Sequence, residues 1–242
     1  MLDPSEVDDL NRQLATSSPK QVIVELITRL PRVALAFSGA EDVLLYHLAS
    51  KLPERPECFS IDTGRLHGET MRYIDRLQDR YKYPVTLLQP DEKELEEFIK
   101  NRGLNSFYEN GHEECCAIRK VAPLRRYLTH YDAWITGQRQ DQSPTRREIP
   151  VIEVDNSFST SEHQVLKINP LAKQSSAQVW QQIRLLEIPY NPLHDRGFVS
   201  IGCEPCTRAI GPGQHEREGR WWWEEATIKE CGLHRGNLDP QD

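Results

Sequence analysis

The sequence lacks any apolar run long enough to cross a membrane. Its longest such segments, VIVELI at residues 22–27 and VALAF at 33–37, are far shorter than the roughly 20 residues that a spanning helix needs. The N-terminus, MLDPSEVDDL, is acidic and lacks the basic and then apolar order of a secretory signal. We therefore expect a cytoplasmic protein with no membrane contact.

Positive charge is also scarce. The chain has 30 Lys and Arg against 37 Asp and Glu, a net charge of −7, which argues against a general nucleic-acid-binding protein. Arginines nevertheless gather in two stretches rich in Gly, Pro or Ser, at residues 138–148 and 215–220. Two alternatives fit these stretches: a basic pocket for a small anionic substrate, or solvated loops.

Cysteines are few as well. The 242 residues include six of them, too few for a disulfide-stapled scaffold, and a reducing cytosol disfavours disulfides. Cys58 lies in the strand-like run 57–62, where we expect a small core residue. The others need a separate explanation: Cys115, Cys116, Cys203, Cys206 and Cys231.

Short apolar runs alternate with amphipathic segments along most of the chain. The apolar runs predict strands at 32–37, 57–62, 84–89, 133–138 and 165–171. The amphipathic segments predict helices at 41–51, 68–82, 91–103 and 112–131, the last interrupted or bent near Pro123. Continuous apolar strands alternating with helices are typical of an α/β fold with a doubly wound, mostly parallel sheet.

Further helices are expected on either side of this pattern. Ser5 is expected to cap a first helix, and Ser18-Pro19 to open a second one that ends at Pro31. Their apolar faces can cover the core or a second copy of the chain, which leaves a homo-oligomer open. A last helix should begin at Ser175 or Ser176.

The composition changes beyond Pro189, where Gly and Pro are frequent and three tryptophans follow one another. We expect residues 1–190 to form the α/β domain with its N-terminal helices. Residues 191–242 are expected to form a cysteine-bearing tail that packs on it as part of the same domain.

Two stretches follow the first two predicted strands, where doubly wound sheets bind ligands. In AFSGAED at 36–42, Gly39 permits a tight turn whose backbone N–H groups can face an anion, although the Walker pattern is absent. In SIDTGRLHGET at 60–70, Asp62, Thr63 and Gly64 come directly after the strand. Taken by themselves, the two stretches also fit an ordinary turn and a polar loop.

Four cysteines could act as one set of ligands. Cys203 and Cys206 have the C-x-x-C spacing of metal ligands, which is equally the spacing of a redox pair. With Cys115 and Cys116 the set reaches four thiolates, enough for zinc or an iron–sulfur cluster. Adjacent helix residues diverge by about 100°, which favours separate iron corners of a [4Fe–4S] cluster over one zinc ion. Unrelated core cysteines beside a separate C-x-x-C remain the alternative.

Cys231 belongs to KECGLH near the C-terminus, between Lys229 and His234. Cationic neighbours lower the pKa of a thiol and favour the nucleophilic thiolate. The pattern therefore favours a nucleophile over a stray terminal cysteine.

Five segments, in this order, resemble the assimilatory adenylyl-sulfate (APS) reductases of bacteria and plants, which form one family with the phosphoadenylyl-sulfate (PAPS) reductases. The resemblance extends from about residue 20 to residue 235. The segments are SGAED (38–42), IDTGRLH (61–67), ECCAIRK (114–120), CEPCTRAI (203–210) and ECGLH (230–234).

The resemblance implies an adenine-nucleotide α-hydrolase-like fold, in which the α/β domain binds the nucleotide. It implies that Cys231 attacks the sulfur of adenylyl sulfate, expels AMP and becomes an S-sulfocysteine. Thioredoxin or a similar dithiol protein would then release sulfite. The implied ligands of a [4Fe–4S] cluster are Cys115, Cys116, Cys203 and Cys206.

The resemblance also assigns the substrate-binding residues. Ser38 and Gly39 would hold the nucleotide, and the stretch from Asp62 through Thr63 and Gly64 to Arg65 would line the cleft. The phosphosulfate is anionic and repels an approaching thiolate unless cations offset its charge. The cations at matching positions are Lys120, Arg217, Arg220 and His234.

Two other functions stay open on these residues. A PAPS reductase would require the 3′-phosphate, but that subclass normally lacks the four-cysteine set, and a dual-substrate enzyme would accept both compounds. A zinc-stabilised nucleotide-binding module would function without Cys231. ATP pyrophosphate cleavage is disfavoured, because the relatives that perform it carry SGGxDS where this chain has SGAED.

Overall fold

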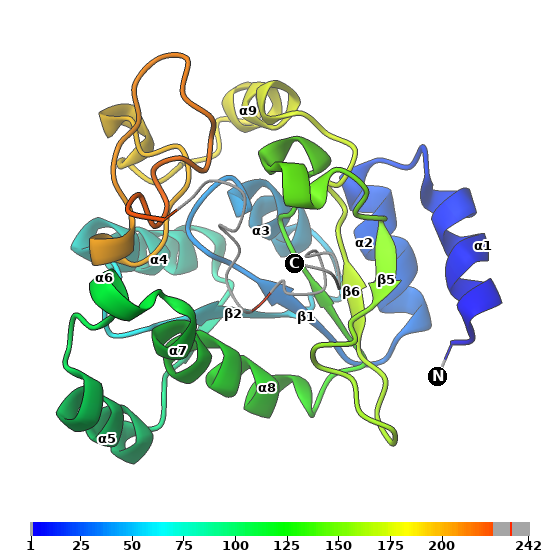
Figure 1. Ribbon diagram of the computed structural model, residues 1–242. Coiled ribbons are helices and arrows are strands. Elements are labelled where there is room, and N and C mark those ends of the chain that lie inside the picture. Colours follow the sequence, from blue (N-terminus) through cyan, green and yellow to red (C-terminus); the bar gives the residue numbers. More distant parts are fainter. Residues whose placement is uncertain (1, 225–232, 234–242) are drawn as a thin grey trace.

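A six-stranded sheet with helices on both faces forms the centre of the computed structural model, which describes residues 2–224 and Leu233 (Figure 1). The strands are β1 Val33–Ala36, β2 Glu57–Ile61, β3 Val85–Leu88, β4 Ala133–Ile135, β5 Ile152–Val154 and β6 Leu166–Ile168. The helices are α1 Pro4–Leu14, α2 Pro19–Arg29, α3 Val43–Ser50, α4 Gly68–Tyr81, α5 Glu92–Arg102, α6 Phe107–Asn110, α7 Glu113–Cys116, α8 Ala122–Leu128 and α9 Ser176–Leu185.

The strand order is β3-β2-β1-β4-β6-β5. All neighbouring pairs are parallel except β5 with β6, so the predicted doubly wound, mostly parallel sheet is confirmed. The chain leaves β1 on one side through β2 and β3 and returns on the other side at β4. The carboxyl ends of β1 and β4 therefore form the switch point of the sheet. The edge strand β5 was not predicted, because Glu153 interrupts its apolar residues and leaves no continuous apolar run.

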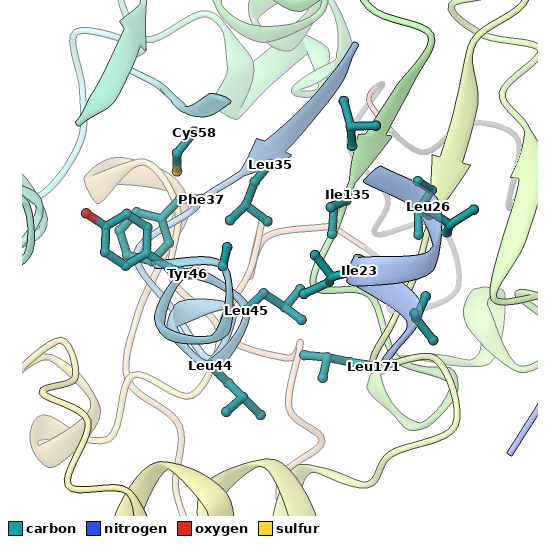
Figure 2. Packing of buried hydrophobic residues seen from close by; sticks show 14 of the residues in the cluster. Ile23, Leu26, Leu35, Phe37, Leu44, Leu45, Tyr46, Cys58, Ile135 and Leu171 are labelled. Carbon is teal, nitrogen blue, oxygen red and sulfur yellow. The ribbon is translucent and has the colours of Figure 1, made fainter. Parts of the chain in front are cut away.

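Alternate residues of each strand face opposite layers of helices, as the pleat requires. Leu35 and Ile135 pack in the larger core with α1, α2, α3, α4 and α9 (Figure 2). Ala34 and Trp134 face the other side, where α8 covers the sheet. Cys58 is buried in the larger core, as predicted.

The two N-terminal helices cover this core with their apolar faces. The buried residues are Val7, Leu10 and Leu14 of α1 and Ile23 of α2. Of the two proposed uses, covering the core or contacting a second copy of the chain, these side chains thus serve the first. The cap of α1 was predicted wrongly: Asp3, not Ser5, accepts a hydrogen bond from the Glu6 N–H. A carboxylate and a hydroxyl are both good caps, so the sequence alone did not separate them.

The predicted interruption near Pro123 takes the form of a π-helical turn. Residues Ala117–Val121 form this turn between α7 and α8, and the Ala122 N–H donates to the Ala117 carbonyl five residues earlier. Pro123 has no N–H to donate to the carbonyl of Arg119, so the α-helical ladder is broken there and the wider winding takes its place. The backbone thus changes course directly after Cys116.

No described helix combines the length and the apolar character that a membrane span requires.

Candidate functional site

A cavity of about 210 Å³ opens at the switch point of the sheet. Phe37 and Ser38 line it from the end of β1, and Thr136, Gly137 and Gln138 line it from the end of β4. This is the position at which open α/β sheets bind ligands. Both basic stretches of the sequence contribute side chains to its wall, so they form a pocket in preference to solvated loops.

The turn after β1 differs from the anion site that the sequence suggested. Gly39 has a φ of +82° and a side chain there would collide with Thr70, as expected of a tight turn. The backbone N–H groups of Ser38 and Ala40, however, both donate to the carboxylate of Asp42. The chain itself supplies the anion for these two donors, because Asp42 is buried beside them.

Three cationic side chains surround the buried ring of Trp221 in the cavity wall. The Nζ atom of Lys120 and the Cζ atoms of Arg217 and Arg220 lie 5.9, 5.8 and 4.6 Å from the ring centroid. His112 stacks on the same ring at 4.0 Å. The aromatic face attracts all three cations and gathers positive charge at one end of the cavity.

A second, smaller chamber next to the cavity contains the four predicted ligand cysteines, which we call the thiol cluster: Cys115, Cys116, Cys203 and Cys206. All four are buried and none forms a disulfide. Lys120 and Cys203 line both the chamber and the cavity. The two spaces are therefore neighbours that share a wall.

The electrostatics of the thiol cluster differ from one cysteine to the next. Burial raises the pKa of Cys206 to about 11 and also raises that of Cys115. Burial acts in the same direction on Cys203, but Lys120, a hydrogen bond with the Thr63 hydroxyl (3.2 Å) and the guanidinium groups of Arg220 and Arg119 together lower the pKa of that thiol. Of Cys115, Cys203 and Cys206, Cys203 is thus the one whose surroundings favour the thiolate.

The spacing of the sulfurs tests which cofactor suits the thiol cluster. Tetrahedral zinc with bonds of about 2.3 Å holds its thiolates roughly 3.8 Å apart. Within the described residues, no three of the four sulfurs lie within 4.8 Å of one another. A cubane cluster separates its ligands more widely, because each thiolate binds a different iron. Four buried thiols are thus a donor set that an iron–sulfur cluster can use, and their sulfurs are not gathered as around one zinc ion.

The predicted substrate residues fall into three groups. Those that line the cavity are Ser38, Thr63, Lys120, Arg217 and Arg220. Those that do not line it are Gly39, Asp62, Gly64 and Arg65. Cys231 and His234 lie outside the described residues, although Leu233 between them in sequence lines the cavity.

Arg65 and Asp62 have other contacts. The Arg65 guanidinium lies 4.9 Å from the ring centroid of Phe107 and donates to the Leu104 carbonyl, and it lines the chamber of the thiol cluster. The Asp62 carboxylate accepts from Gly64 and Gln89. Both residues thus order the edge of the site instead of facing the cavity.

Sequence reasoning missed several residues of the cavity wall. Gln142 and Arg146 come from the first basic stretch, and Ile201 and Gly202 from the segment before Cys203. A side chain at Gly202 would collide with the guanidinium of Arg220, so glycine permits this close approach. One available signal was the position of residues 136–138 directly after β4. Ligands of doubly wound sheets bind at the switch point, and these residues lie there opposite the turn after β1.

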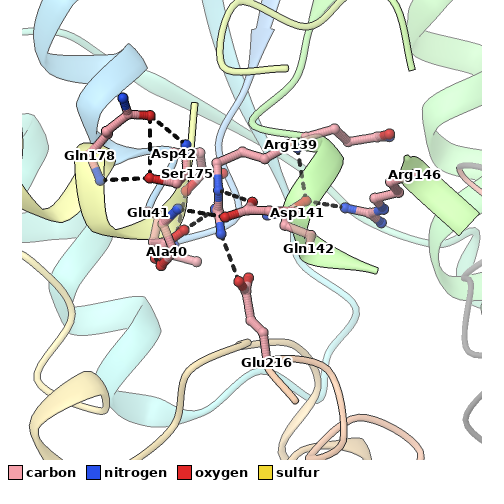
Figure 3. Close-up of polar contacts among 12 residues, drawn as sticks. Ala40, Glu41, Asp42, Arg139, Asp141, Gln142, Arg146, Ser175, Gln178 and Glu216 are labelled. Carbon is pink, nitrogen blue, oxygen red and sulfur yellow. Dashed lines mark hydrogen bonds and ion pairs between the residues drawn. The ribbon is translucent and has the colours of Figure 1, made fainter. Parts of the chain in front are cut away.

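A buried ion network joins three parts of the cavity wall (Figure 3). Arg139, with a side chain that is 0% exposed, donates to Glu41, to Asp141 at 3.0 Å and to Glu216 at 2.6 Å. Glu41 and Glu216 both line the cavity. Burial raises the pKa of Glu41, and it raises that of Glu216 to about 7.

This geometry agrees with the comparison with known proteins. A family model described as the phosphoadenosine phosphosulfate reductase domain matches residues 32–209, which include both strands of the switch point. The chain belongs to this family. The match includes Cys203 and Cys206 at the start of the C-terminal tail and ends before the rest of that tail.

Members of this reductase family are similar to the chain over nearly its whole length. It is 52% identical to the adenosine 5'-phosphosulfate reductase of Pseudomonas aeruginosa, over 98% of this chain and 90% of that protein. It is 50% identical to the chloroplastic 5'-adenylylsulfate reductase 3 of Arabidopsis thaliana, over 98% of this chain but 54% of that longer protein. The crystal structure of phosphoadenylyl-sulfate (PAPS) reductase from Candida auris superposes with a TM-score of 0.73, at 27% identity, over 87% of this chain and 98% of that one.

Proposed function

We propose that this member of the reductase family reduces adenylyl sulfate to sulfite and AMP in sulfate assimilation. The observation that carries the proposal is the shared wall between the cavity and the thiol cluster, in which Lys120 lines both spaces. The names of the relatives that match nearly the whole chain support the same substrate.

The cavity suits an adenine nucleotide with an anionic tail. Ala36, Phe37 and Trp134 give its walls at β1 and β4 a largely apolar surface. Residues 136–138 add polar groups next to this surface. Its other end carries Lys120, Arg217 and Arg220 around Trp221. We propose that the nucleoside lies at the switch point and that the phosphosulfate faces these cations, which offset its negative charge.

Cys231 is the proposed nucleophile. Its thiolate attacks the sulfur of adenylyl sulfate, the bond from that sulfur to the phosphate oxygen breaks, and AMP leaves with the electron pair. A dithiol protein of the thioredoxin type then attacks the Cys231 sulfur, and sulfite leaves with the electron pair of the S–S bond. The second thiol of the donor releases Cys231 and the donor becomes a disulfide. Leu233, two positions after Cys231, lines the cavity, which supports this role.

The four thiolates of Cys115, Cys116, Cys203 and Cys206 are the proposed ligands of a [4Fe–4S] cluster. Such a cluster would contribute charge next to the phosphosulfate end of the cavity. Lys120 lowers the pKa of Cys203 from the same wall, which supports an electrostatic link between the ligands and the substrate site. Free thiols and a dithiol reductant both require a reducing compartment, so we place the reaction in the cytoplasm.

The decisive experiment follows the sulfur atom. The wild-type protein and Cys231→Ser are incubated with sulfur-labelled adenylyl sulfate in the absence of reductant, and Cys58→Ser serves as the control for an unrelated buried thiol. Wild type and the control should retain labelled sulfur on the protein and release it as sulfite when thioredoxin is added. Equal label on Cys231→Ser would disprove the nucleophile.

The two alternatives are separated by substrate and by metal content. Initial rates with adenylyl sulfate and with its 3′-phosphorylated form should favour the former, and the reverse preference would make the chain a PAPS reductase. Protein purified without air should contain about four iron ions per chain, as the cluster requires. Zinc in place of iron, together with nucleotide binding that Cys231→Ser retains in full and no reduction of either compound, would support the nucleotide-binding module.

A further inference from the structure

The arginine segment, residues 215–220, carries Arg217 and Arg220 into the cavity wall. At its C-terminal end the backbone forms hydrogen bonds with residues 206–208. The Arg208 N–H donates to the Gly219 carbonyl at 3.0 Å, and the Trp221 N–H donates to the Cys206 carbonyl at 3.1 Å. This pairing fixes one end of the segment beside the thiol cluster.

The other end of the arginine segment is joined to the α/β domain through Glu216. Its carboxylate accepts from Arg139 at 2.6 Å, and the same guanidinium donates to Glu41 in the turn after β1. Glu41 is itself held by the Ser176 hydroxyl at the start of α9 (2.7 Å). Arg139 therefore lies between the arginine segment and a part of the fold that is already fixed.

The fork shape of the guanidinium makes this arrangement possible. Separate nitrogens of Arg139 meet Glu41 and Glu216, while its Nε meets Asp141. A buried guanidinium is stable only where it is paired in this way. Glu216 directly precedes Arg217 in the chain. An anchored Glu216 side chain therefore restrains the backbone at Arg217 as well.

We propose that Arg139 is a positioning residue that fastens the arginine segment over the cavity through Glu216, and so holds Arg217 and Arg220 where they meet the anionic end of the substrate. The inference rests on the proposed function for the identity of that substrate. The connection between Glu41, Arg139 and Glu216 acts through the two arginines and does not itself touch the reacting atoms.

Three variants separate positioning from general stabilisation. Glu216→Ala removes the acceptor that joins the segment to Arg139. Glu216→Gln keeps an acceptor oxygen in nearly the same place. Asp141→Asn is the matched control, because Asp141 contacts the same guanidinium but is 41% exposed and does not belong to the arginine segment.

Hydrogen exchange of the backbone, read by mass spectrometry, tests the connection without any turnover. In Glu216→Ala, residues 209–220 should exchange at least about tenfold faster than in the wild type, with the sheet unchanged, because local opening sets that rate. Glu216→Gln and Asp141→Asn should exchange like the wild type. Unchanged exchange in Glu216→Ala, or equal acceleration throughout the fold, would overturn the proposal.

Kinetics and AMP binding complete the test. In Glu216→Ala the KM for adenylyl sulfate and the Kd for AMP should rise about tenfold, with a smaller change in kcat, since a displaced cation weakens ground-state binding. Arg139→Lys keeps the charge but loses the fork, and it should show the same changes if Glu216→Ala does not fold. If the wild type does not reduce adenylyl sulfate, the proposed function is wrong. Hydrogen exchange and AMP binding would still decide whether Arg139 positions the arginine segment.

Discussion

Lys120 illustrates how single residues link the two parts of the site. It lies at the boundary between the cavity and the thiol cluster, is buried, and contacts the face of Trp221. A buried ammonium is costly unless neighbouring groups compensate its charge. Here it adds positive charge to the end of the cavity next to Trp221 and lowers the pKa of Cys203.

Replacement of Lys120 should therefore damage the reaction more than the fold. We expect Lys120→Ala to reduce kcat/KM by about a hundredfold, in the range seen when one charge-stabilising donor is removed from an active site. Steady-state rates with thioredoxin measure the effect, and the exposed Lys173→Ala is the matched control. A loss no larger than that of Lys173→Ala would remove Lys120 from the site.

Glu216 gives the protein a pH dependence near neutrality. Burial raises its pKa to about 7, and the charged groups that face it are Arg139, Glu41, Asp141 and Arg146. A carboxyl group whose pKa is raised by folding stabilises the fold fully only below its ordinary pKa. This contribution is lost as the pH rises through about 7.

The wild type should accordingly lose about 1 to 2 kcal/mol of unfolding free energy between pH 5.5 and pH 8 relative to Glu216→Gln, which has no proton to release. Urea denaturation of both proteins at the two pH values measures the difference. Parallel pH profiles would show that Glu216 keeps an ordinary pKa.

Among the elements, the π-helical turn Ala117–Val121 has the clearest consequence for the site. It separates α7, which ends at Cys116, from α8, and it contains Arg119 and Lys120. Arg119 donates from this turn to the Thr63 carbonyl at 2.6 Å. The wider winding therefore helps to aim neighbouring side chains at the chamber and at the cavity.

Pro123→Ala tests the origin of this turn, because alanine supplies the N–H that an α-helical bond to Arg119 needs. We expect the segment to rewind as an α-helix and to rotate Lys120, with kcat/KM lower by about tenfold, or about 1.4 kcal/mol. A crystal structure and steady-state rates check both effects. Pro53→Ala, in an exposed loop, should change neither, and a retained π turn in Pro123→Ala would assign its cause elsewhere.

At the scale of the whole molecule, the thiol cluster ties together segments that are almost ninety residues apart in sequence. Cys115 and Cys116 precede the π-helical turn, and Cys203 and Cys206 lie in the C-terminal part that carries the cations. Phe98 of α5, Phe107 of α6 and Trp221 pack around the four cysteines. A cofactor bound here would join both parts of the chain.

If the thiol cluster holds the proposed iron–sulfur cluster, removal of iron should lower the melting temperature of the protein. We expect Cys203→Ala, or wild type stripped of iron by a chelator, to melt about 5 to 10 °C lower than the loaded protein, since metal binding contributes directly to folding. Calorimetry and iron analysis measure this. Cys58→Ala, which deletes a buried thiol outside the cluster, should keep its iron, and a similar fall in iron content there would contradict the assignment of ligands.

The sequence determined the α/β alternation, the parallel strands and the cysteine set, because apolar periodicity and residue spacing are local properties of a chain. It also indicated Thr63, Lys120, Arg217 and Arg220, which do line the cavity. Only the tertiary structure decided that Asp42 occupies the turn after β1 and that Arg139 joins Glu41 and Glu216, which are both far from it in sequence. The contacts of Arg139 arise where the ends of β1 and β4 meet the C-terminal segment, and nothing in the local sequence around Arg139 specifies Glu41 and Glu216 as its partners.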